Sequence, residues 1–173
     1  MERKIPRKNY IILAVTIILT VLLVFYLRGW YITTKDYYAQ NSVIKDVVRE
    51  IKEDEISNYT LESGKFALYV SSGQNTSVKD FENEFKKLIA KSNCQNNVLY
   101  LNTDGIDVKN LNDSLRDNFA KNDRVKNSIS DNSMATLYLF EEGKISSVIN
   151  NVDNYSVKSI NKIIKKWGLS DNA

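Results

Sequence analysis

The chain of 173 residues contains 24 Lys and Arg against 21 Asp and Glu, with no His and a single Cys. Without His it lacks the usual acid–base group and the commonest metal ligand, and one Cys can form neither an intramolecular disulfide nor a cysteine-based zinc site. The net charge of +3 is carried by residues 1–9, so the remainder is neutral and has no electrostatic footprint for nucleic acid. We therefore expect no cofactor, no metal and no nucleic-acid partner.

Residues 10–27, YIILAVTIILTVLLVFYL, carry no charge over 18 positions, which is near the length that crosses a bilayer core as a helix. A cleaved signal peptide is the alternative, but the apolar run is long and no small-x-small cleavage site follows it. Tyr26, Trp30 and Tyr31 suit an interfacial aromatic belt. The pattern predicts an uncleaved transmembrane anchor over residues 10–28.

Lys and Arg flank this apolar run unequally. Four of them precede it within nine residues, and only Arg28 and Lys35 lie in the nine residues after it. Positive residues favour the cytoplasmic side, so we expect a cytoplasmic N-terminus and a single-pass protein of the cell membrane with its C-terminal domain outside. The predicted division is a cytoplasmic basic tail, an anchor, a juxtamembrane region with a helix, and a folded domain: residues 1–9, 10–28, 29–57 and 58–173.

The segment after the predicted anchor has the apolar spacing of a helix. Ile44, Val47, Val48 and Ile51 recur at helical spacing and predict an amphipathic helix over residues 36–54. The following connector has room for a short edge strand at residues 58–61. Gly64 then turns the chain into the next strand.

The stretch from Phe66 to Phe85 is the centre of the predicted domain. Residues 66–70 form an apolar run typical of a buried strand, and residues 71–76 have loop composition. Ser77 can cap a helix that continues to Lys91. A second strand is predicted at residues 98–102, which completes a right-handed βαβ unit.

The remaining elements alternate in the same way. Apolar residues from Val108 to Phe119 at 3-4-4 spacing mark a helix, and residues 121–133 read as a polar surface loop. A strand at 135–140, a turn at 141–144 and a strand at 145–149 predict an antiparallel hairpin. A final helix follows around Val157–Trp167, so that helices cover both faces of a mixed sheet.

Several short segments carry a resemblance to a known family. They are Tyr69-Val70, Phe81 and Glu84, the run Leu99–Asp104, and Thr136–Phe140 followed by Glu142-Gly143-Lys144. With them the sequence resembles the thioredoxin-like family, and within it the membrane-anchored bacteriocin transport accessory type of Gram-positive bacteria, over roughly residues 65–169. The resemblance implies an α/β thioredoxin-like fold, with a mixed sheet, a βαβ unit and a C-terminal ββα unit.

Both chemical hallmarks of that family are missing from this sequence. The positions of its Cys-x-x-Cys pair fall on Asn75 and Val78, or on Gln74 and Ser77 if the alignment shifts by one. Ala135 stands where the family has a cis-proline, so we expect a trans Met134–Ala135 bond. Disulfide exchange needs a thiolate and a resolving thiol, so we predict no enzymatic activity and no catalytic residue.

What remains is a candidate partner surface built on the former active-site loop. Its residues are Ser72, Gly73, Gln74, Asn75, Thr76, Ser77, Val78, Met134, Ala135 and Thr136. Cys94 lies beyond the helix that follows the loop, about 25 Å from its start by helical rise, and reads as a passive thiol. Lys158, Lys162, Lys165 and Lys166 read as a solvated helix face, with contact to anionic lipid or wall polymer as the alternative.

Three functions remain open on this basis. The first is a non-catalytic interaction module for a membrane or secreted protein. The second is an accessory protein of peptide or bacteriocin export related to thiol–disulfide oxidoreductases. The third is an anchored subunit of a secretion or conjugation machine, which would need a curved antiparallel sheet.

Overall fold

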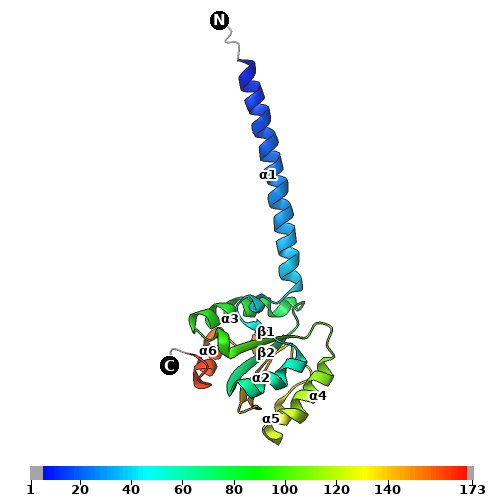
Figure 1. Cartoon of the computed structure of the whole chain (residues 1–173), viewed down its shortest axis with the longest axis vertical. Coiled ribbons are helices and arrows are strands. Elements are labelled where there is room, and N and C mark those ends of the chain that lie inside the picture. The colour runs from blue at the N-terminus through cyan, green and yellow to red at the C-terminus, as the bar shows by residue number, and fades with distance from the viewer. Residues whose placement is uncertain (1–5, 171–173) are drawn as a thin grey trace. The chain divides into compact units, whose positions relative to one another are not determined.

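The computed structural model describes residues 6–170, and its residue contacts divide the chain after Tyr38 into two units. The first unit is occupied by helix α1 (Arg7–Gln40), which is long and apolar enough to cross a membrane over Arg7–Tyr37 (Figure 1). Thr16 and Thr20 donate their hydroxyls to the carbonyls of Ile12 and Thr16, one turn back. Such bonds leave no hydroxyl unsatisfied in hydrocarbon. Residues 1–5 of the expected basic tail lie outside the described residues.

The second unit is built on a five-stranded sheet in the order β1-β3-β2-β4-β5. Its strands are β1 (Arg49–Glu50), β2 (Lys65–Ser71), β3 (Val98–Asn102), β4 (Ala135–Glu141) and β5 (Lys144–Asn150). β3 pairs in parallel with β1 and β2, whereas β4 pairs antiparallel with β2 and β5. The predicted mixed sheet, with a βαβ unit followed by a hairpin, is confirmed.

Helices cover both faces of this sheet. They are α2 (Ile56–Glu62), α3 (Lys79–Lys91), α4 (Val108–Asn118), α5 (Asp123–Ser128) and α6 (Val157–Lys166), with 3₁₀ turns η1 (Val43–Asp46), η2 (Glu53–Glu55), η3 (Thr76–Val78), η4 (Gln95–Asn97) and η5 (Val152–Asn154). One core lies under η1, α3 and α6, and the other under α2, α4 and α5. Figure 1 shows α3 and α6 on one side of this unit and α4 and α5 on the other.

The predicted amphipathic helix over residues 36–54 is wrong. Helix α1 ends at Gln40, Ser42 caps the turn η1 through its hydroxyl (Ile44 N donates at 3.3 Å), and the chain then extends into β1. Ile44 and Val48 pack into one core, but Ile51 packs into the other. A single helix face would hold all of them on one side, whereas an extended chain that passes the edge of the sheet reaches both cores.

Two short helices replace an expected strand and part of an expected loop. Residues 58–61 belong to α2, which follows η2, where the backbone N–H of Lys52 donates to Oε2 of Glu55 at 2.7 Å. Helix α5 lies within the expected loop 121–133, and the Asn122 side chain caps it by accepting from Val125 N at 3.0 Å. The capped turn η2 leads into α2, and the Asn122 cap starts α5; apolar periodicity over so few residues reveals neither helix.

The aromatic pair Phe66–Phe140 provides a test of the sheet's packing. The two rings stack with centroids 4.7 Å apart and both side chains are fully buried. We expect Phe140→Ala to lower the free energy of unfolding by about 3–5 kcal/mol, because it removes a buried ring and leaves a cavity. Chemical denaturation of the full chain in detergent, followed by near-UV circular dichroism, measures this.

Leu61→Ala is the matched control, because this leucine is 87% exposed on α2. It should change the free energy of unfolding by no more than about 0.5 kcal/mol. Equal losses in the two variants would contradict the assignment of Phe140 to the core.

Candidate functional site

The candidate site is the edge of the sheet where β2 and β3 end side by side. Parallel strands of an α/β sheet place ligand-binding loops at their carboxyl ends. Here one side chain holds the loops after both strands, because Asn102 Oδ1 accepts from Gly73 N at 3.0 Å and from Asp104 N at 3.1 Å. The Ser72 hydroxyl also donates to Asp104. These hydrogen bonds tie the loop that follows β2 to the loop that follows β3.

Gly73 sits where a side chain would be tightly crowded. A Cβ on this residue would lie 3.0 Å from Asp104 Oδ2 and 3.1 Å from the backbone nitrogen of Ser42. The backbone nitrogen of Ser42 belongs to the segment before η1 and cannot move without shifting that segment. The close approach thus joins three segments that are far apart in the sequence.

The helix after the loop begins differently from the prediction. Asn75, not Ser77, is the capping residue: its Oδ1 accepts from Ser77 N at 3.0 Å and from Ser77 Oγ at 2.7 Å. The 3₁₀ turn η3 then leads into α3, which has Asp80 in its first turn. The predicted cap at Ser77 is wrong by two residues, because the 3₁₀ turn was not visible in the apolar spacing.

The structure brings the two parts of the predicted partner surface together, and we call residues 72–78 and 134–136 the loop surface. Ser77 Oγ donates to Met134 Sδ at 3.5 Å, and the Met134–Ala135 peptide bond is trans, as expected. The ten residues divide by exposure: Gln74, Thr76, Ser77 and Met134 are exposed, Ser72 and Asn75 are half-buried, and Gly73, Val78, Ala135 and Thr136 are buried. Only the first six can meet a partner.

The loop surface has little depth. The cavity beside Met134 and Thr136 has a volume of about 30 Å³, room for a few water molecules at most. Drug-sized ligands occupy clefts of roughly 300–1,000 Å³. This cavity is well below that size.

Beneath the loop lies a buried carboxylate that the sequence analysis missed. Glu82 of α3 is 1% exposed and accepts three hydrogen bonds: from Tyr69 OH at 3.0 Å, from Ser71 Oγ at 2.9 Å and from Val43 N at 3.3 Å. A signal was present, since Glu82 falls at helical spacing between the apolar residues Val78 and Phe85. The carboxylate ties α3 to β2 and to η1.

The groups around this carboxylate have shifted acidities. Burial, and next the charge of Glu82, raise the pKa of Tyr69 well above its ordinary value, and burial also raises the pKa of Tyr100. Partial burial lowers the pKa of Lys79, against the opposing attraction of Glu82 and Asp104. Both phenols are thus neutral donors at physiological pH, and Tyr69 acts as one by donating to Glu82.

The thiol takes no part in this site. Cys94 is fully buried beyond the other end of α3, with its Sγ 3.7 Å from the carbonyl oxygen of Ile89. With one Cys in the chain there is no Cys-x-x-Cys pair. Within residues 6–170, the structure places no three His, Cys, Asp or Glu side chains together where they could hold a metal ion.

Solved structures show what this architecture resembles. Thioredoxin f2 of Chlamydomonas reinhardtii aligns with a TM-score of 0.50 and 12% identity over 69% of this chain and 94% of that chain. The fold is thioredoxin-like. Mitochondrial thioredoxin 3 of Saccharomyces cerevisiae aligns at 13% identity (69% of this chain, 94% of that chain, TM-score 0.47), and Plasmodium falciparum thioredoxin at 10% (69% and 99%, 0.49). No family model and no curated protein matches the sequence.

The buried carboxylate of this thioredoxin-like domain predicts a large effect of one substitution. Glu82→Ala should lower the free energy of unfolding by about 3–5 kcal/mol, because it leaves the buried donors of Tyr69, Ser71 and Val43 without their acceptor. Urea denaturation of the full chain in detergent measures the loss.

Glu84→Ala is the matched control on the same helix. Glu84 is exposed and pairs only with Lys87 three residues on, a type of contact worth about 0.2–1 kcal/mol. If Glu82→Ala cost no more than Glu84→Ala, the carboxylate would not organise this edge of the domain.

Proposed function

We propose that the chain is a membrane-anchored, extracytoplasmic interaction module that binds a membrane or secreted protein through its loop surface, without catalysis. The observation that supports this is the occupancy of the family's two cysteine positions. If these positions are Asn75 and Val78, the first is a helix cap and the second is buried in the core. If they are Gln74 and Ser77, both are exposed polar side chains. Neither alignment supplies a thiol. The frame of a thioredoxin-like site is kept while its reactive groups are replaced.

The chemistry of the exposed residues favours a protein as the partner. Gln74, Thr76 and Ser77 offer donors and acceptors, and Met134 is 58% exposed. Methionine is flexible and polarizable, and it is common on surfaces that adapt to peptide partners. An exposed methionine surrounded by polar side chains is typical of a small protein–protein contact rather than of a substrate cleft.

The resemblance to the bacteriocin transport accessory type extends this proposal. On this proposal the protein belongs to a Gram-positive cell membrane and works beside machinery that exports peptides. The related alternative, an accessory protein with oxidoreductase activity, would need a second thiol from another molecule. The alternative of a secretion or conjugation subunit requires a curved antiparallel sheet. The parallel pairing of β2 and β3 argues against it.

The proposed topology predicts where the C-terminus lies. Alkaline phosphatase fused after Ala173 should be active in intact cells, because that enzyme forms its disulfides only outside the cytoplasm. A β-galactosidase fusion at the same residue is the reciprocal control and should be inactive. The reverse pattern of activities would place the domain inside the cell and contradict the proposal.

A photocrosslinking residue at Gln74 or Met134 should yield one adduct of defined mass in cells, because both side chains are exposed on the loop surface. The same residue at Glu142, in the exposed turn between β4 and β5, is the matched control and should not yield it. Immunoblotting and mass spectrometry of the adduct give the measurement.

Two further variants separate the alternatives. Met134→Lys should remove the adduct formed from Gln74, because it places a charge in the middle of the contact. Cys94→Ser should leave that adduct intact, since the thiol is buried away from the loop. An adduct that survives Met134→Lys, or that depends on Cys94, would overturn binding through this surface.

A further inference from the structure

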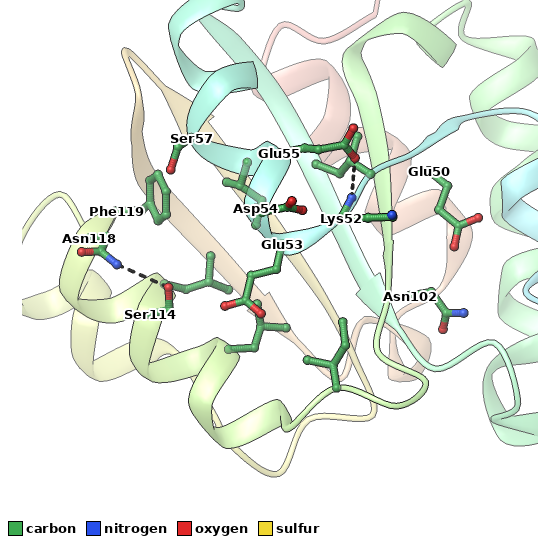
Figure 2. Close-up of a pocket in the computed structure, with 15 residues that line it drawn as sticks. Glu50, Lys52, Glu53, Asp54, Glu55, Ser57, Asn102, Ser114, Asn118 and Phe119 are labelled. Atoms are coloured by element: carbon green, nitrogen blue, oxygen red, sulfur yellow. Dashed lines mark hydrogen bonds between the residues drawn. The ribbon is translucent and has the colours of Figure 1, made fainter.

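A second feature of the domain is a groove between the segment 50–57 and helix α4. The groove between them has a volume of about 980 Å³ and runs from Glu50 and Asn102 at one end to Ser57 and Phe119 at the other (Figure 2). It is thus some thirty times larger than the cavity beside Met134. This volume lies at the upper end of the range of ligand-binding clefts, which is roughly 300–1,000 Å³.

The base of this groove is apolar. Ile51, Ile56, Leu111 and Leu115 are buried beneath it, and Ile106 and Phe119 are partly exposed along it. Ser114 and Asn118 of α4 add an uncharged polar wall, in which Asn118 Nδ2 donates to Ser114 Oγ at 3.3 Å. The two walls come from segments that are far apart in the sequence, so the groove is a product of the fold.

The rim of the groove is acidic. Its four carboxylates belong to Glu50, Glu53, Asp54 and Glu55, against one cation, Lys52. The Glu55 carboxylate already accepts a hydrogen bond from the Lys52 backbone N–H. None of the ion pairs formed among residues 6–170 involves Glu50, Glu53 or Asp54. In Figure 2 the Glu53 side chain extends from its segment toward α4, across the groove. An apolar base under an uncompensated negative rim is complementary to a basic amphipathic partner.

The length of the groove sets the size of this partner. Its α4 wall extends from Ile106, just before the helix, to Phe119, just after it. Eleven helical residues span about 16 Å, which matches about three turns of a partner helix. Amphipathic helices bind in grooves of this kind through apolar side chains at positions i, i+3, i+4 and i+7.

We infer that this groove binds a basic amphipathic helix of a partner protein. The apolar face of that helix lies against Ile106 and Phe119, and its Lys or Arg side chains face Glu50, Glu53 and Asp54. This site and the loop surface share no residue, but they meet at Asn102, which lines the end of the groove and accepts from Gly73 N at 3.0 Å. The domain would then make two contacts at once. The one at the loop surface is polar with an exposed methionine, and the one at the groove is apolar with an acidic rim.

Some of the acidic residues on the rim also have a structural role that does not involve a partner. Glu53, Asp54 and Glu55 stand at the start of η2 and α2, where negative charge is favoured by the helix dipole. That effect explains acidic residues at these positions, but neither Glu50 nor the open apolar groove beside them. The test below therefore asks for peptide selectivity as well as for a charge effect.

The test uses the full chain in nanodiscs of uncharged phosphatidylcholine and a fluorescent peptide of about fourteen Leu and Lys residues with Leu at helical spacing. Fluorescence anisotropy, corrected with empty nanodiscs, should show saturable binding. The double variant Glu53→Gln/Asp54→Asn should weaken it about three- to tenfold, because it removes two charge contacts while keeping side-chain shape. Ser57→Arg, at an exposed position on the groove wall, should abolish binding through bulk and charge.

The controls decide between the groove and a general attraction of charges. Asp80→Asn/Glu142→Gln removes two exposed carboxylates elsewhere and should leave the affinity unchanged. A scrambled peptide of the same composition should bind at least tenfold more weakly. Equal binding of the scrambled peptide, equal weakening by the control variant, or displacement of the peptide by spermine at an equal charge concentration would each overturn the proposal.

Discussion

Strand β2 is buried on both faces, and this constraint determines most of the domain. Residues 66–71 are all buried, so every backbone N–H and C=O in that stretch must find a partner within the protein. β3 supplies them on one side and β4 on the other. Alternate side chains then face opposite cores, with Tyr69 in one and Phe66 and Leu68 in the other. A strand in this position requires helices on both faces of the sheet and places the loop after Ser71 at its carboxyl edge.

The polar groups at that edge follow from the same burial. Tyr69 and Ser71 end β2 with hydroxyls that face the core under α3, and there they need an acceptor. Glu82 provides it and in turn is desolvated at a cost that its three hydrogen bonds offset. A catalytic thioredoxin-like site would use this edge to hold a thiolate. Here the edge is held by the Asn75 cap and the buried Val78, and the chain has a single Cys, which lies elsewhere in the domain.

The parts that could be predicted from the sequence are those in which one physical signal acts alone. Residues 66–70, 98–102 and 135–140 are predominantly apolar runs, and each forms the expected strand. The segment after α1 was misread because Ile44, Val48 and Ile51 keep helical spacing while packing into different cores. The same holds for the candidate site. The loop after β2 could be located from the strand before it. Contacts with other segments decide the rest, which comprises the cap at Asn75, the carboxylate of Glu82 and the groove.

The two outer strands of the sheet have a consequence for how copies of this domain behave when they are crowded together. β1 is only two residues long and both are exposed and charged, so it offers almost no template for strand addition. On β5, the backbone of Ile145 is already engaged by Phe119 O at 2.7 Å and by Lys121 N at 3.1 Å. Crowding brings copies into frequent collision. A sheet that is short at one edge and partly occupied at the other offers little for a second sheet to pair with, so these encounters disfavour sheet-to-sheet aggregation.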